Sequence, residues 1–319
     1  MAELGISMDG RAPIADIPAQ AQAAEAGGAT TLWIACHLFL RDPITTAAVA
    51  LGATRRIRIA LMAMSPYSTH PVFIAMAAAT LDEMYPGRVI LCLGVGAPAD
   101  LKAAGIESPQ PLATLSETVS VCRSLLAGET VDVQGQIFRV AGRRLASGRR
   151  DVPIVLAASR PNMLRLAGRA TDGVLISAAT APPFVEACLD QAAAGAGGRA
   201  FRKLGIVYTK LAATETEAID PIRRPIGFVL RGAHHAENIR LSGASLDQAT
   251  LAAAYAAEDW ATVDRLVSDD VVRRHAACGT AAQVRAKLAE YRAIGLDEVI
   301  LGGLDDAPSI AAALAAARG

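Results

Sequence analysis

His37 is the residue whose type and position most directly suggest acid–base chemistry. An imidazole gains and loses a proton near neutral pH, and His37 follows Leu32–Ala35, a short apolar run typical of a buried strand. A histidine at a strand end can act beside a cofactor as a hydrogen-bonding or proton-transfer group. A packed neutral ring is the alternative, but position and residue type together favour a functional role.

Three other histidines are expected to do other work. His70 stands before Pro71, where a helix is expected to begin, so capping or packing is favoured over catalysis. His234 and His235 lie in a long region between two expected strands. A lid over the site is one interpretation of that pair, and a plain exposed loop is the favoured one.

A candidate anion site lies at Ser159-Arg160-Pro161-Asn162, between an expected strand and an expected helix. The start of a helix presents free N–H groups and partial positive charge, and an arginine adds a bidentate donor for phosphate. An ordinary strand–helix junction explains the string equally well. Gly94 and Gly96 end another strand, where glycine permits either the close approach of a flat ligand or a tight turn.

These residues need strands whose carboxyl ends meet at one face, and the chain supplies alternating strands and helices. Such alternation with apolar strands predicts a parallel sheet, and eight units favour a closed (β/α)8 TIM barrel, with its active site at the strands' carboxyl ends. No GxGxxG follows the first strand, which weakens the open dinucleotide-binding alternative. The expected strands are Leu4–Met8, Leu32–Ala35, Ile57–Met62, Val89–Val95, Val152–Leu156, Gly173–Ser177, Leu204–Leu211 and Glu298–Gly302.

Two segments fall outside the alternation. A β-hairpin is expected over about 129–145, around Gln134–Gly135. A mostly helical insertion is expected before the last strand, over about 213–279, because that stretch is too long for a simple crossover. Neither carries a linker composition, so residues 1–319 are expected to form a single domain.

Composition narrows the possible partners. Lys plus Arg and Asp plus Glu number 31 each among 319 residues, and that neutral balance argues against nucleic acid. No CxxC pair occurs among the five cysteines, so a reducing cytoplasm and no metal site are expected. No apolar run approaches the roughly 20 residues of a membrane span, so no membrane association is expected either.

Several longer strings resemble the luciferase-like oxidoreductases, in order along the chain. They are Leu32-Trp-Ile, Arg41-Asp-Pro43, Ser65-Pro-Tyr-Ser-Thr-His-Pro71, Ala79-Thr-Leu-Asp-Glu-Met-Tyr-Pro-Gly-Arg88, Leu91-Cys-Leu-Gly-Val-Gly96, and the segment from Ala158 to Gly173. The last third matches mainly through Thr280–Gly303. The string at 65–71 is most similar to the methylenetetrahydromethanopterin reductase branch, which uses the deazaflavin coenzyme F-420.

The resemblance implies a tricyclic ring at the strand ends, above a bulge in the third strand where Met62–Ala63 is a cis peptide. It implies a phosphate at the helix start of residues 160–163, and it matches His37 with a histidine near the ring in some members. The implied catalytic residue is His37. The implied cofactor-binding residues are Met62, Ala63, Met64, Ser65, Gly94, Gly96, Ala158, Ser159, Arg160, Pro161, Asn162, Met163 and Ser177.

The sequence also departs from that pattern. Relatives often carry an acid at the positions of Cys36 and Ala97, so the proton donor cannot be carried over. Hydride transfer between reduced coenzyme F-420 and a small organic substrate is the leading hypothesis. An FMN-dependent monooxygenase and a catalytically silent flavin-binding barrel are the alternatives, and a homodimer is expected. The acidic tail of the deazaflavin is expected to meet Arg143, Arg144, Arg149 and Arg150.

Overall fold

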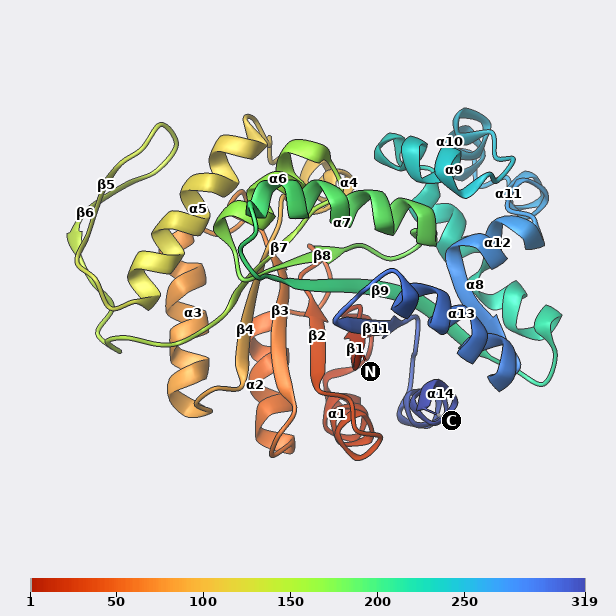
Figure 1. Cartoon of the computed structure of the whole chain (residues 1–319), viewed down its shortest axis with the longest axis horizontal. Helices are drawn as coiled ribbons and strands as arrows, with labels where there is room; N and C mark the ends of the chain where they lie inside the picture. Colours follow the sequence, from red (N-terminus) through yellow and green to blue (C-terminus); the bar gives the residue numbers. More distant parts are fainter. Residues whose placement is uncertain (1, 319) are drawn as a thin grey trace.

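The computed structural model describes residues 2–318, and within them eight parallel strands close into a barrel (Figure 1). The predicted TIM barrel is therefore confirmed, with strand boundaries shifted by one or two residues. Each strand pairs with the next around the barrel, and β9 closes the ring by pairing with both β8 and β11. The strands are β1 (Glu3–Met8), β2 (Thr31–Ala35), β3 (Arg58–Met64), β4 (Val89–Leu93), β7 (Ile154–Ala157), β8 (Gly173–Ile176), β9 (Arg202–Leu211) and β11 (Glu298–Gly302).

Side chains alternate between two apolar layers, as strands buried on both faces require. Trp33, fully buried, is the largest side chain inside the barrel, where Met62, Cys92 and Ile206 also lie. The Trp33 indole donates a 2.8 Å hydrogen bond to the buried Glu298 carboxylate, so its one polar atom is satisfied. The outward-facing side chains pack under helices built largely from alanine and leucine.

Side-chain caps fix the starts of several surrounding helices. Asp42 caps its helix by accepting a 2.7 Å hydrogen bond from the Thr45 amide, and Thr280 and Gln283 form a capping box. The 3-10 turn η1 (Ile14–Asp16) leads into the first helix. The barrel helices are α1 (Ile17–Ala26), α2 (Pro43–Ala53), α3 (Pro71–Met84), α5 (Pro111–Leu126), α6 (Pro161–Ala170), α7 (Pro182–Ala196), α13 (Ala281–Ala293) and α14 (Ala307–Arg318), with a short α4 (Pro98–Ala103) after β4.

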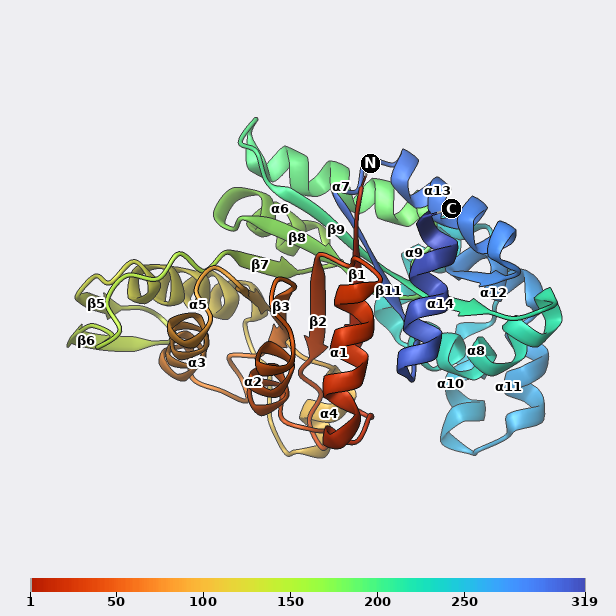
Figure 2. The same ribbon diagram turned by 90° about the horizontal axis from the view of Figure 1, so that it is seen from below.

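The predicted hairpin is present as β5 (Val131–Gln134) and β6 (Arg139–Arg143). Its turn is held by Glu117 of α5, whose carboxylate accepts hydrogen bonds of 2.8–3.0 Å from the amides of residues 136–138. Figures 1 and 2 show the hairpin and the insertion projecting from opposite ends of the molecule.

The insertion contains helices, as predicted, but it ends in a strand. Helix α8 (Glu215–Leu230) begins at the Thr214 capping box, and β10 (Ala276–Gly279) adds in parallel to the overhanging end of β9. The sequence Ala-Ala-Cys-Gly contains no β-branched residue, so only the unpaired edge of β9 explains this strand. Between them lie η2 (Ala233–His235), α9 (Ala236–Ser242), α10 (Gln248–Ala256), α11 (Trp260–Leu266) and α12 (Asp269–His275).

Among residues 2–318, no helix combines the length and the apolar character needed to cross a bilayer.

Candidate active site

Hydrogen bonds join the ends of β2, β3 and β4 at the barrel mouth, the face formed by the carboxyl ends of the strands. The Cys36 amide donates to the Met62 carbonyl at 2.5 Å, and the Ser65 hydroxyl donates to the Val95 carbonyl at 2.6 Å. The β3–β4 register shifts between Leu61 and Met64, and the Met62–Ala63 peptide bond is cis. The predicted bulge and cis bond are both confirmed.

Two glycines let the backbone of β4 lie close against β3. A Cβ added at Gly94 would lie 2.8 Å from the Ala63 Cβ, which is too close without movement of one strand. Gly96 has φ of +93°, a conformation that side chains rarely adopt, and a Cβ there would press on Ser65 at 3.3 Å. Close packing at Gly94 and the tight turn at Gly96 therefore both require glycine, and we call this part of the mouth, where Gly94 and Gly96 lie against Ala63 and Ser65, the glycine floor.

His37 lies just past β2 with its ring about half exposed, and it faces a carboxylate that the sequence did not predict. Its Nδ1 is 3.6 Å from Oδ2 of Asp100, a residue of α4. The sequence signal for this short helix is Pro98 shortly after Gly96, a proline at a helix start. Figure 2 shows α4 beyond the end of β2, which explains how an acid far along the chain reaches the histidine.

The predicted anion site is an exposed helix start. Arg160 is the N-cap of α6 and makes no side-chain capping hydrogen bond, and Pro161 occupies the first helical position. Leu164 provides the first amide that closes a helical hydrogen bond, to the Arg160 carbonyl, so the amides of Asn162 and Met163 are turned outward. Among residues 2–318, no partner is seen for the Arg160 guanidinium, so this end of the site offers backbone donors and that guanidinium to an anion.

His234 lies within electrostatic range of Arg160. Partial burial, and then the nearby Arg160 guanidinium, lower the pKa of the His234 imidazole. Its neighbour His235 is buried, with ring centroids 4.3 Å apart. The favoured interpretation of this pair as a plain exposed loop was wrong for His235, whose side chain is buried, whereas His234 is exposed.

The loop after β8, which carries the exposed Ser177, is fixed by the insertion. The Asn238 amide group donates to the Ala179 carbonyl at 2.7 Å and accepts from the Ala181 amide at 2.9 Å. Asn238 is fully buried, and the Tyr291 hydroxyl adds a 2.7 Å bond to the Thr180 carbonyl. Tertiary contacts therefore set the shape of this loop.

Some predicted residues point elsewhere. The side chain of Met64 packs in the layer between barrel and helices. Its carbonyl accepts a hydrogen bond from the Gly94 amide, so its backbone helps to fix the position of Gly94. Met163 likewise packs against that layer, and Ala158 continues β7 by a hydrogen bond to Leu175. These three residues contribute backbone, not reactive side chains.

The four arginines proposed to meet an acidic tail were placed wrongly. Arg149 pairs with Asp151 at 2.8 Å, and Arg150 reaches Glu83 at the end of α3. Both lie before β7 begins, whereas the anion site follows β7, so the strand separates them. Arg143 and Arg144 belong to the outer strand of the hairpin and its exit.

Tyr208 and Asp9 complete the mouth, near a small cavity. Burial, and then the Asp9 carboxylate, raise the pKa of the Tyr208 phenol. A cavity of about 240 Å³ opens beside the end of β1, lined by Asp9, Arg11 and Arg41 among others. A larger hollow of about 520 Å³ lies around Glu3 and Arg202, where strands begin, which is the stabilising face of such barrels.

Two cysteines at the site are poor nucleophiles. Burial, and then Asp42, raise the pKa of the Cys36 thiol to about 11, and burial raises that of Cys92 further. Neither thiol ionises near neutral pH.

The barrel is closed and parallel, its third strand carries a bulge beside the glycine floor, and the start of α6 is exposed. These features define a class of enzymes that bind a flat, phosphate-bearing cofactor at the strand ends. The family model described as "Luciferase-like monooxygenase" matches residues 2–298, and the chain belongs to this family.

Known proteins resemble the chain over nearly its whole length. A 5,10-methylenetetrahydromethanopterin reductase of Methanolobus tindarius is 30% identical over 91% of this chain and 90% of its own. The Archaeoglobus fulgidus protein of the same name is 28% identical over 88% and 86%. The structure of the coenzyme F420-dependent tetrahydromethanopterin reductase from Methanopyrus kandleri superposes with a TM-score of 0.89, at 23% identity, over 99% of this chain and 97% of that one.

Proposed function

We propose that this chain is an oxidoreductase that transfers hydride between reduced coenzyme F420 and a small organic substrate. The observation that carries the proposal is the full-length similarity to the methylenetetrahydromethanopterin reductases, joined to a bulged, glycine-floored barrel mouth. A shorter match, 37% identical over 40% of this chain, is to an F420-dependent glucose-6-phosphate dehydrogenase of Nocardia farcinica. Since these relatives act on unlike substrates, they do not identify the substrate here.

The residues present fit a flat ring with a phosphate-bearing tail. Gly94 and Gly96 bring the end of β4 close against Ala63 and Ser65, and the ring would lie against this closely packed backbone. The uncapped start of α6 offers outward amides for the phosphate, with Arg160 and His234 beside it. When bound, the reduced deazaflavin would supply the hydride, and the protein would position it and exclude water.

In this proposal His37 is the catalytic residue. It lies at the mouth with its ring half exposed, so it can reach a substrate and hold or donate a proton. Ser177, at the end of β8, would line the cofactor site together with residues 158–163.

Cofactor titration tests the proposal. Purified protein would be titrated with coenzyme F420 and with FMN, following the fluorescence of each. We expect micromolar binding of F420 and a loss of about 3- to 10-fold for Arg160→Ala, modest because the amides remain. Arg165→Ala, an exposed arginine one turn further along α6, is the control and should bind as wild type.

The same titration decides between the alternatives. Tight FMN binding without F420 affinity would replace the proposal with an FMN-dependent monooxygenase. Binding of F420 without turnover of imine, enone or carbonyl substrates would favour a silent flavin-binding barrel.

We also propose that the enzyme is a cytoplasmic homodimer. Helix α3 presents Phe73, Met76 and Met84 to solvent, with Phe73 63% exposed, and Leu112 of the adjacent α5 extends the apolar face. All five cysteines are free thiols, in keeping with a reducing compartment. Sedimentation equilibrium of the wild type and of Phe73→Glu tests the dimer, and a monomeric wild type would contradict it. A localisation assay that finds the protein outside the cytoplasm would contradict the proposed location.

A further inference from the structure

We propose that Asp100 is the positioning residue for His37, orienting the ring at the barrel mouth through its Nδ1. The Nδ1–Oδ2 distance of 3.6 Å is longer than a hydrogen bond but within the range of a charge pair. The catalytic part of the proposal rests on the proposed function, whereas the pairing itself does not.

The position of Asp100 is built by the fold. Helix α4 follows the glycine floor directly, and the Leu101 amide donates to the Ala97 carbonyl at 3.0 Å. Leu101 is 2% exposed and packs within 3.5 Å of where a Cβ on Gly96 would lie. Because the residue next to it is anchored in the floor, the Asp100 side chain is held at the edge of the mouth.

His37 is held from the opposite side. The backbone before it is tied to β3 by the Cys36–Met62 bond, and its own carbonyl accepts from the Leu40 amide at 3.3 Å. The histidine and the aspartate therefore come from separately anchored segments, after β2 and after β4, that converge at the mouth.

Other charged groups on the neighbouring loops have partners of their own. Asp9 is paired with Arg11, and Arg41 donates to the carbonyls of Gly10 and Arg11. Asp42 is engaged in capping α2. Among the described residues, Asp100 is thus the carboxylate paired with His37.

Neither Cys36, next to His37 in the sequence, nor Lys102, near Asp100 on α4, provides the negative charge that would pair with the His37 ring. Cys36 stays neutral because burial raises its pKa to about 11. Lys102, on α4 with Asp100, is exposed and carries a like charge that would oppose a protonated ring rather than stabilise it.

The pairing gives the proton a defined route. With Nδ1 toward Asp100, Nε2 is the ring nitrogen left for the substrate. When bound, the reduced deazaflavin would supply hydride to the carbon of a C=N or C=O group, whose π electron pair would move to nitrogen or oxygen. His37 would then give its Nε2 proton to that atom, keep the electrons of the broken N–H bond as a neutral ring, and regain a proton from solvent.

The decisive measurement uses the protein without cofactor. Histidine ring signals of isotopically labelled protein would be followed by NMR from pH 5 to 9, with the His37 signal assigned by its loss in His37→Asn. We expect Asp100→Asn to move the midpoint of that signal down by about 0.5–1 pH unit, because the imidazolium loses its partner. Asp100→Glu should restore part of the shift, and Glu107→Gln, an exposed acid in the following loop, should leave the midpoint in place.

Activity provides the second readout. With reduced F420, the acid limb of the kcat/KM profile should move in the same direction for Asp100→Asn, with the cofactor KM unchanged. An unchanged NMR midpoint in folded Asp100→Asn would overturn the pairing. A shifted midpoint in a protein that never binds F420 would uphold the pairing and sink the proposed function instead.

Discussion

At the scale of single residues, the geometry of the site depends on two positions that have no side chain, Gly94 and Gly96. The end of β3 and the end of β4 lie so close that Gly94 and Gly96 leave no space for side chains. Ser65 locks this approach through its bond to the Val95 carbonyl. The two glycines therefore fix how closely the ends of β3 and β4 approach each other.

Gly94→Ala tests the glycine floor. The added methyl would meet the Ala63 Cβ at 2.8 Å, so one strand must move. We expect a loss of about 1–3 kcal/mol in the free energy of unfolding and at least tenfold weaker cofactor binding. Gly52→Ala is the matched control, because Gly52 is exposed on α2 and a methyl there meets only the end of the Tyr85 side chain. Chemical denaturation and titration measure both; a Gly94→Ala protein as stable and as tight-binding as wild type would contradict the prediction.

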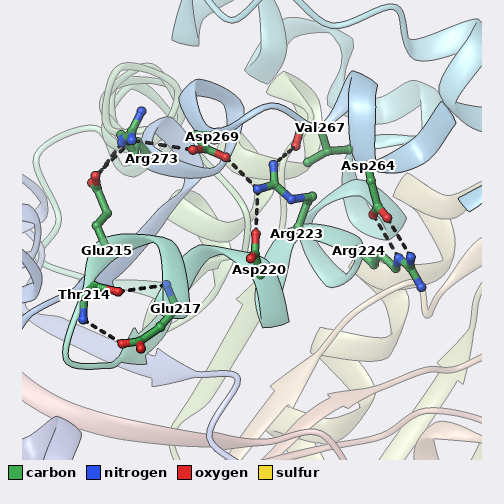
Figure 3. Close-up of polar contacts among 10 residues, drawn as sticks. All are labelled: Thr214, Glu215, Glu217, Asp220, Arg223, Arg224, Asp264, Val267, Asp269 and Arg273. Atoms are coloured by element: carbon green, nitrogen blue, oxygen red, sulfur yellow. Dashed lines mark hydrogen bonds and ion pairs between the residues drawn. The ribbon is translucent and has the colours of Figure 1, made fainter. Parts of the chain in front are cut away.

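At the scale of elements, the insertion is held together by a network of arginines and acids (Figure 3). Arg223 of α8 donates to Asp269 and to the Val267 carbonyl, each at 2.6 Å, and to Asp220 at 2.9 Å. Its side chain is only 14% exposed. One partly buried guanidinium therefore joins α8 to the α11–α12 junction.

Arg223→Ala should destabilise the insertion. Removing the guanidinium leaves Asp220 and the Val267 carbonyl without this donor, while Asp269 keeps Arg273 at 3.8 Å. Because both carboxylates are partly exposed, we expect a cost of about 1–2 kcal/mol in unfolding free energy. Arg240→Ala is the control, because Arg240 pairs with Glu237 on the exposed face of α9 and should leave stability close to wild type. Hydrogen exchange would localise the effect; equal protection of α8 and α12 in both variants would contradict it.

At the scale of the whole molecule, residues 2–318 form two apolar cores outside the barrel interior. The main one lies between barrel and helices, and the second, around Ile226, Leu251 and Val272, belongs largely to the insertion. Two buried histidines stand at this second core. Burial lowers the pKa of His235 to about 3, with smaller contributions from His234 and His275, and burial lowers that of His275 to about 4.

These histidines predict a loss of stability in acid. Below pH 6.5 the unfolded chain takes up protons at both residues while the folded chain does not, so stability is fully present above that pH. It falls between about pH 6.5 and 4, by up to roughly 1.4 kcal/mol per pH unit for each histidine. His275→Gln should flatten the pH dependence of the unfolding free energy by about one histidine's share. Parallel curves for variant and wild type between pH 6.5 and 5 would contradict this assignment.

Local patterns in the sequence determined the barrel and most of its helices. The buried strands read as apolar runs, and helix starts such as Asp42–Pro43 and Thr280–Gln283 are set by capping, which depends on neighbours a few residues away. The glycines of the floor, the cis bond and the α6 helix start were also predicted, the bond through the family resemblance. His37 was found because it lies at a strand end.

Only the tertiary structure decided which groups meet. Asp100 faces His37 because two strands bring segments about sixty residues apart to one mouth, and no local signal encodes that distance. The arginines at 149 and 150 are close in sequence to the anion site, yet β7 carries the chain to the other face before the site begins. β10 exists because β9 overhangs its neighbours, and its own residues have no strand preference. Residues at the two ends of one strand lie on opposite faces of the barrel, however close they are in sequence. Residues that follow different strands can meet, because a parallel barrel gathers the carboxyl ends of all its strands at one face.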